Sequence, residues 1–212
     1  MSGDCTRMNL RGKVMSDVPF LSGEKVYLRR LRESDAQGPY PSWFNDEEVC
    51  RGNSHHVFPY SQEQALAYIR ENQGTDCRLV LAIARKEDGA HIGNIALDNI
   101  NYFNRTAALT IIVGDKAAWG KGYGREAALL ICEHGFVTLN LHRIFSGTFE
   151  DNAGFRRIAQ YLGMVEEGRR RQEAFKLGRY VDIVEYGLLR DEFLQRFHRA
   201  NPAEARRAEE GS

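Results

Sequence analysis

The chain has 212 residues, 42% hydrophobic and 27% charged, which is typical of a globular domain rather than a disordered chain. Lys and Arg together number 29, as do Asp and Glu, so no net charge draws the protein to nucleic acid or to a membrane surface. Its four cysteines and six histidines lack the spacing of a metal site or a disulfide framework. No segment reads as a membrane span or a signal peptide, so a cytoplasmic location is expected.

Residue patterns predict one domain over 23–190, preceded by a leader (1–22) and followed by a short helix and a charged tail (191–212). Alternating apolar residues and turn signals separate the strands, and apolar faces at helical spacing mark the helices. The elements expected in chain order are a strand over 25–31, helices that begin at 34 and 61, strands over 78–84, 91–100 and 107–113, a helix over 125–139, a strand over 142–149, a helix over 152–162, and strands over 164–174 and 180–189.

The loop between the strand expected over 107–113 and the helix expected over 125–139 contains three glycines, Gly120, Gly122 and Gly124. Glycine lets a backbone turn with its N–H groups unobstructed, and the start of a helix offers further unpaired donors and the positive end of a dipole. Lys121 adds a positive charge. The loop therefore predicts a site for phosphate or pyrophosphate.

Two familiar phosphate-binding motifs do not match this loop. A Walker loop needs Ser or Thr where Gly122 stands, and a dinucleotide-binding loop needs glycine where Arg125 stands. The dinucleotide motif also opens a βαβ unit, whereas this loop follows a run of strands. A tight turn that needs glycine for geometry alone remains the other interpretation.

The segment Trp119-Gly120-Lys121-Gly122-Tyr123-Gly124 resembles the coenzyme A pyrophosphate loop of the GCN-type N-acetyltransferase (GNAT) superfamily. The helix that starts at Asn152 and ends in Leu162-Gly163-Met164 is similar to a second family motif. The tryptophan and the opening segment 28–35 resemble the ribosomal-protein N-acetyltransferase (Rim) branch. The likeness covers about 24–190 and implies a mixed α/β fold. That fold has a mostly antiparallel sheet of six or seven strands with helices on both faces.

This resemblance implies transfer of an acetyl group from acetyl-coenzyme A to a primary amine, which attacks the thioester directly. The acceptors that compete are a protein N-terminus, an amino sugar or aminoglycoside, and a polyamine. The family often holds glutamate and tyrosine at the positions of Ala108 and Ala159, and neither alanine can move a proton. A coenzyme A-binding regulatory domain with impaired catalysis is therefore the alternative.

The resemblance also assigns coenzyme contacts to a strand end, to the glycine loop and to the start of a later helix. The expected residues are Ile112, Val113, Gly114, Trp119, Gly120, Lys121, Gly122, Tyr123, Gly124, Arg125 and Asn152. For Asn152 a helix N-cap is an equally good interpretation, because asparagine caps helices well.

Two residues are candidates for proton transfer in place of the missing pair. Glu150, at the end of a strand, is the candidate general base, and Tyr161 the candidate acid for the departing thiolate. The other interpretation of Glu150 is a charged strand end beside a helix N-terminus.

Acids and aromatic residues before the second helix predict the acceptor site. The residues expected there are Trp43, Asn45, Asp46, Glu47, Arg51 and His55. A solvated helix end over half-buried aromatic residues is the alternative interpretation. Phe193 and Phe197, expected on an exposed helix, suggest a homodimer contact.

Overall fold

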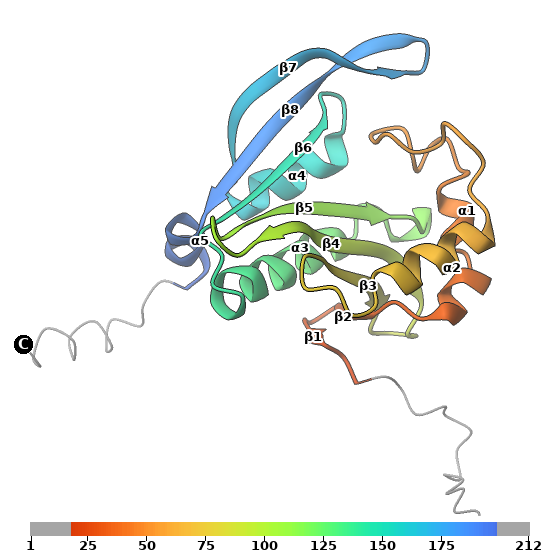
Figure 1. Ribbon diagram of the computed structural model, residues 1–212, viewed down its shortest axis with the longest axis horizontal. Coiled ribbons are helices and arrows are strands. Elements are labelled where there is room, and N and C mark those ends of the chain that lie inside the picture. The colour runs from red at the N-terminus through yellow and green to blue at the C-terminus, as the bar shows by residue number, and fades with distance from the viewer. Residues whose placement is uncertain (1–17, 199–212) are drawn as a thin grey trace, which may run out of the picture.

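Successive apolar side chains alternate between the two faces of a sheet, so the nearly continuous apolar runs of the middle strands let both faces be buried under helices. The computed structural model describes residues 18–198 and shows a mixed sheet in the order β1-β2-β3-β4-β5-β6-β8-β7 (Figure 1). Neighbouring strands are antiparallel except β5 and β6, which are parallel. The strands are β1 (Leu21–Ser22), β2 (Val26–Arg30), β3 (Leu79–Arg85), β4 (His91–Asn101), β5 (Thr106–Val113), β6 (Arg143–Phe149), β7 (Val165–Lys176) and β8 (Arg179–Leu189).

The expectation of six or seven strands is wrong, because the described residues form eight. The additional strand, β1, lies in the segment predicted to be a leader and pairs with β2, with Leu21 opposite Leu28. Two residues are too short to show a period of alternation, so the sequence pattern gave no signal for this strand.

The helical elements are η1 (Glu33–Gln37), α1 (Tyr40–Trp43), α2 (Gln62–Glu71), η2 (Lys116–Ala118), α3 (Tyr123–Glu133), the π-helical η3 (His134–Thr138), α4 (Ala153–Leu162) and α5 (Arg190–Phe197). Ser61 and Gln64 form the capping box that starts α2, each side chain bonding the other residue's N–H. Gly163 ends α4 in the left-handed conformation, with φ of 81°. No helix among residues 18–198 has the length and apolar character needed to cross a membrane.

Helices cover both faces of the sheet, as expected (Figure 1). The larger core lies under α3 and α4, and we call this side of the sheet the α3 face; it includes Ile95, Leu109 and Phe155. The other side, the α2 face, packs against η1, α1 and α2, and includes Tyr40 and Trp43. Alternation along each strand then decides which side chains reach which face.

Strands β5 and β6 pair over only three residues and then diverge. Their last pair is Ala108 with Phe145, so the segments 109–113 and 146–149 border an opening in the sheet (Figure 1). We call this gap the β5–β6 opening.

The C-terminal part of the described chain differs from the expected dimer helix. Phe193 of α5 is completely buried and packs on Phe136, with ring centroids 5.1 Å apart, while Phe197 is half-buried beside it. The expectation that both rings are exposed is wrong for Phe193, because α5 folds back onto η3. The charged tail predicted after residue 202 lies outside the described residues.

Candidate active site

The glycine loop adopts the conformation that its glycines allow. Gly120 and Gly122 have φ of 74° and 87°, in the left-handed region, and Gly122 is the N-cap of α3. The first bond of the helix runs from the N–H of Glu126 to the carbonyl of Gly122. The N–H groups of Tyr123 to Arg125 therefore precede the first helical bond, as the donors of an anion site do.

The third glycine serves packing. A Cβ on Gly124 would lie 3.3 Å from Val113 Cγ2 and 3.5 Å from Ile158 Cδ1. The first turn of α3 is thus held close to the end of β5 and to α4, beside the β5–β6 opening.

A hollow of about 510 Å³ adjoins the glycine loop. Four cationic side chains and two acidic ones share its lining, which consists of Glu24, Lys25, Arg85, Lys86, Glu87, Lys121 and Tyr123. The turn before β2 is fixed to α3 because the carboxylate of Glu126 accepts the N–H groups of Glu24 and Lys25. Cations held beside unpaired amides suit a ligand that carries several phosphates.

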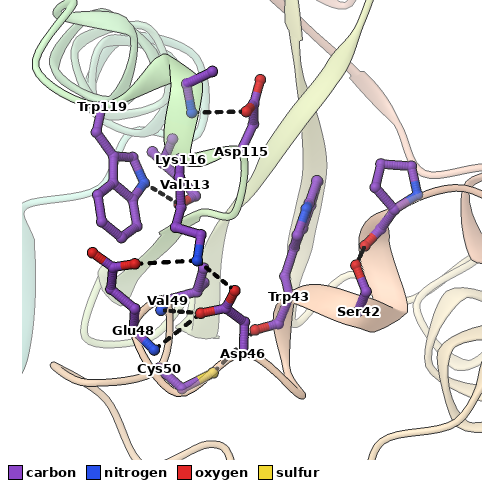
Figure 2. A network of polar contacts seen from close by, with 12 residues as sticks. Ser42, Trp43, Asp46, Glu48, Val49, Cys50, Val113, Asp115, Lys116 and Trp119 are labelled. Atoms are coloured by element: carbon purple, nitrogen blue, oxygen red, sulfur yellow. Dashed lines mark hydrogen bonds and ion pairs between the residues drawn. The ribbon is translucent and has the colours of Figure 1, made fainter.

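The end of β5 offers fewer backbone groups to the opening than expected. The N–H of Gly114 donates to Ile92 on β4, and the alternation of a strand places the N–H of Ile112 on that same edge. Contact of the Ile112 and Gly114 amides with the coenzyme is therefore not supported. Val113 faces the other edge, where its carbonyl accepts the indole N–H of Trp119 at 2.7 Å (Figure 2).

Asn152 is committed to contacts within the protein. Its Oδ1 accepts the N–H of Phe155 at 3.0 Å, the N-cap bond of α4, and its Nδ2 donates to Thr148 Oγ1 and to the Gly52 carbonyl. The structure therefore confirms the N-cap interpretation and gives no free amide donor for the coenzyme.

Glu150 does not face the β5–β6 opening. Its carboxylate lies 3.5 Å from the N–H of Asp182 on β8 and 3.7 Å from Arg169 on β7. Both strands lie on the far side of β6 from the opening, so the prediction of Glu150 as general base is not supported. The ring of Tyr161 contacts Phe197 and lies under the guanidinium of Arg125, at 5.5 Å, so Tyr161 is near the coenzyme loop; its role as an acid stays a prediction.

Two residues of the predicted acceptor site are part of the protein's own packing. Trp43 is buried against Gly114, where no side chain other than hydrogen would fit beside the indole, so its predicted role in acceptor binding is wrong. Asn45 fixes the loop by exchanging hydrogen bonds with the backbone of Tyr60, 2.7 Å in each direction.

Asp46 forms an ion pair with Lys116, the first residue of η2. Lys116 Nζ lies 2.7 Å from Asp46 Oδ2 and 3.1 Å from Glu48 Oε2 (Figure 2). The hydrogen bond from Lys116 lowers the pKa of Asp46, and the same bond raises the pKa of Lys116. The predicted acidic patch is therefore weaker than its sequence suggests.

The loop that follows closes over the wide end of the opening. The Gly52 carbonyl meets Asn152 before α4, and the His55 carbonyl accepts Lys176 Nζ from β7. His55 itself packs its ring on Phe44 with centroids 4.5 Å apart. Glu47 and Arg51 are exposed on this loop, and their role in acceptor binding stays a prediction.

The structure also contains a buried network of charged side chains that was not expected from the sequence. Arg29 and Asp35 form a bidentate pair of 2.8 Å bonds, and His91 Nδ1 lies 3.5 Å from Asp35 Oδ1. Burial raises the pKa of Asp35, but bonds from Arg29 and His91 outweigh it and hold that pKa well below its usual value. Among residues 18–198, no three His, Cys, Asp or Glu side chains gather as a metal site would require.

The model of the acetyltransferase (GNAT) domain family matches residues 25–165, about two thirds of the chain. The chain belongs to the GNAT family. It is accordingly an N-acetyltransferase, and acetyl-coenzyme A is its acyl donor. The glycine loop, the hollow with its cations and the β5–β6 opening are the features of this GNAT domain that fit such a donor.

Similar proteins carry related names. The N-acetyltransferase YnaD of Bacillus subtilis, itself uncharacterised, is 28% identical over 82% of this chain and 98% of its own length. The spermidine N(1)-acetyltransferase of Vibrio cholerae is 33% identical, over 50% of this chain and 60% of its own length. The crystal structure of a V. cholerae spermidine N-acetyltransferase with CoA and spermine matches the GNAT domain with a TM-score of 0.72 at 23% identity, over 80% of this chain and 98% of that one. That likeness shows the fold.

Proposed function

We propose that this GNAT domain acetylates a small primary amine, which approaches the thioester from the α2 face. The observation that carries this proposal is the end of β5–β6 pairing at Ala108 and Phe145. Beyond that pair β6 no longer pairs with β5, so the backbone groups of Val113 on that edge have no partner in β6. The glycine loop beside Val113 supplies amides for the pyrophosphate of the donor.

The two faces of the opening suit different substrates. The α3 face is filled by α3 and α4, and the glycine loop leads into the first turn of α3, so the donor enters at the N-terminal end of α3. On the α2 face, the core that packs under η1, α1 and α2 includes no β6 residue among residues 18–198, and the loop of residues 44–60 forms the rim there. The amine therefore has its approach on the α2 face.

The acceptor class follows from charge. Because Lys116 offsets one of the two negative charges of Asp46 and Glu48, the three side chains keep a single net negative charge, which favours an amine with one positive charge over a polycation. An amino sugar and a protein N-terminus, the acceptor implied by likeness to the Rim branch, both meet that description. Spermidine is the second candidate, because relatives named spermidine acetyltransferases match half of the chain at about 30% identity.

Direct attack needs a neutral amine. An amine with a pKa near 10.4 is neutral in only about one molecule in a thousand at pH 7, so a nearby base increases the rate. Holding both substrates in the opening supplies a further part of the rate enhancement.

The test measures free thiol released from acetyl-coenzyme A with glucosamine, an N-terminal peptide and spermidine, for the wild type and Gly122→Glu. A carboxylate at residue 122 would repel the pyrophosphate, so we expect donor binding and turnover to fall at least tenfold. Gly178→Glu is the matched control, since Gly178 has φ of 77° and lies in the β7–β8 turn with open space around it. Donor binding without turnover on any amine would favour the regulatory alternative. Wild type that does not bind acetyl-coenzyme A would refute both.

A further inference from the structure

Glu185 places its carboxylate over the strand that borders the β5–β6 opening. It stands opposite Gly147 in the antiparallel pair of β6 and β8. A Cβ on Gly147 would lie 3.1 Å from Glu185 Oε1 and 3.3 Å from Oε2. The carboxylate thus bends over β6 into the space that a side chain at residue 147 would fill.

This carboxylate lies on the face from which the amine approaches. Val184 and Tyr186 are in the core of the α3 face, so Glu185 between them points to the α2 face. Gly147 is two residues beyond Phe145, the last β6 residue paired with β5, so Glu185 lies level with the open part of the sheet.

The ion pair of Glu185 leaves one oxygen directed away from its cation. Arg170 on β7 donates its Nε to Oε1 at 2.6 Å and uses Nη1 for Glu173. The side chain of Glu185 is 31% exposed, so a substrate can reach it. The bond from Arg170 orients the carboxylate, so that both of its oxygens lie beside Gly147 and Oε2 has no bond to Arg170.

The other carboxylates on this face are less suited to meet an amine. Asp98, opposite Ala108, uses Oδ1 for Arg78 and Oδ2 for the hydroxyl of Thr110. Glu167 is held by Arg143 through both oxygens and lies over Gly187, level with the joined part of β5 and β6.

We propose that Glu185 receives the acceptor amine, with Gly147 as the gap that lets its carboxylate reach the β5–β6 opening. This inference rests on the proposed function and names the group that holds the amine there. The carboxylate first binds the ammonium form and then accepts a proton from it, directly or through one water. The neutral nitrogen attacks the thioester carbon, the N–C bond forms and the C–S bond breaks. The nitrogen loses its second proton, which passes through water to the departing thiolate and gives the free thiol, and Glu185 returns its proton to solvent.

The decisive variant is Glu185→Gln, compared with wild type over pH 6 to 10 on the amine that the wild type acetylates best. We expect kcat/KM for the amine to fall about 100-fold at pH 7 with the KM for acetyl-coenzyme A unchanged. The loss should shrink as the pH rises toward the pKa of the amine, because a growing fraction of the amine is then neutral without help. A purely structural role of Glu185 would lower the rate equally at every pH.

Two further variants and one control complete the test. Glu185→Asp retains the charge, so it should retain the wild-type pH profile at a reduced rate. Gly147→Ala adds a methyl group against the carboxylate and should lower kcat/KM for the amine about tenfold without affecting donor binding. Glu167→Gln is the matched control, an Arg-paired glutamate on the same face, and should behave as wild type.

The outcomes separate this inference from the proposed function. If the wild type acetylates amines and Glu185→Gln keeps its rate and pH profile, Glu185 is not the receiving group. A loss in Glu167→Gln as large as that in Glu185→Gln would also overturn the inference, because position over the opening would then not matter. If the wild type acetylates no amine, the proposed function fails, and the inference fails with it.

Discussion

The indole of Trp43 lies directly on Gly114, so closely that a Cβ at residue 114 would overlap the ring. This contact joins α1 to the end of β5, the strand edge that borders the opening. Trp43 also packs against His91 with ring centroids 4.9 Å apart, and through His91 it adjoins the buried Arg29–Asp35 pair. The position of the loop of residues 44–60, which follows Trp43, therefore depends on packing in the core.

Gly114→Ala should destabilise the fold by about 1–3 kcal/mol, because the added methyl group must displace a buried indole that has nowhere to go. Urea unfolding at pH 7 measures the change. Gly168→Ala is the control: Gly168 lies in β7 with open space around its Cβ position, and its replacement should leave stability within about 0.5 kcal/mol of wild type. Equal stability of the two variants would show that Trp43 can move.

Asp35→Asn should destabilise by about 3–5 kcal/mol at pH 7, because the buried guanidinium of Arg29 loses its carboxylate. The pKa of Asp35 is lowered in the folded state. Its stabilisation is therefore complete above the unfolded pKa near 3.9 and is lost as the pH falls below that value. The difference between wild type and variant should shrink by roughly 1 kcal/mol at pH 3. Urea unfolding at the two pH values measures this, and a constant difference would contradict it.

The order of the elements could be predicted from the sequence because each has a local signal. Apolar residues, alternating or in runs, identified β2 to β5, and the Ser61 capping box and Gly163 marked a helix start and a helix end. Gly122 at the start of α3 has the left-handed backbone that the glycine loop required. These features depend on residues near each other in the chain.

The side-chain contacts of the site could not be predicted in this way, because they join distant segments. Asn152 meets Gly52 across 100 residues, and Lys116 meets Glu48 across 68. A sequence shows that such groups exist but not whether another segment already satisfies them. For the same reason Glu150 at its strand end suggested a base, whereas Glu185 in β8 gave no signal: only the register of β6 and β8 places it over Gly147.

Asn152→Ala tests whether the amide holds the coenzyme or the fold. Loss of the N-cap of α4 and of the bonds to Thr148 and Gly52 should destabilise by about 1–2 kcal/mol. The affinity for acetyl-coenzyme A, measured by calorimetry, should change less than threefold. Asn152→Asp keeps the cap and loses the Nδ2 donations to Gly52 and Thr148, but the Thr148 hydroxyl can turn to donate to the carboxylate, so the variant should recover much of the stability. A tenfold loss of donor affinity in both variants would restore the coenzyme role.

Lys116→Met should change acceptor preference by releasing the carboxylates of Asp46 and Glu48. In the wild type Lys116 offsets one of their two negative charges, and its bond keeps the pKa of Asp46 low; in the variant that pKa should rise toward its ordinary value. Loss of the lysine adds to the net negative charge of the rim, which then attracts polycations more than monocations. The KM for spermidine should fall up to about fivefold relative to that for glucosamine, an effect that 0.5 M salt should abolish. Lys116→Arg preserves the charge balance and should keep the wild-type ratio; an unchanged ratio in Lys116→Met would place the acceptor away from this rim.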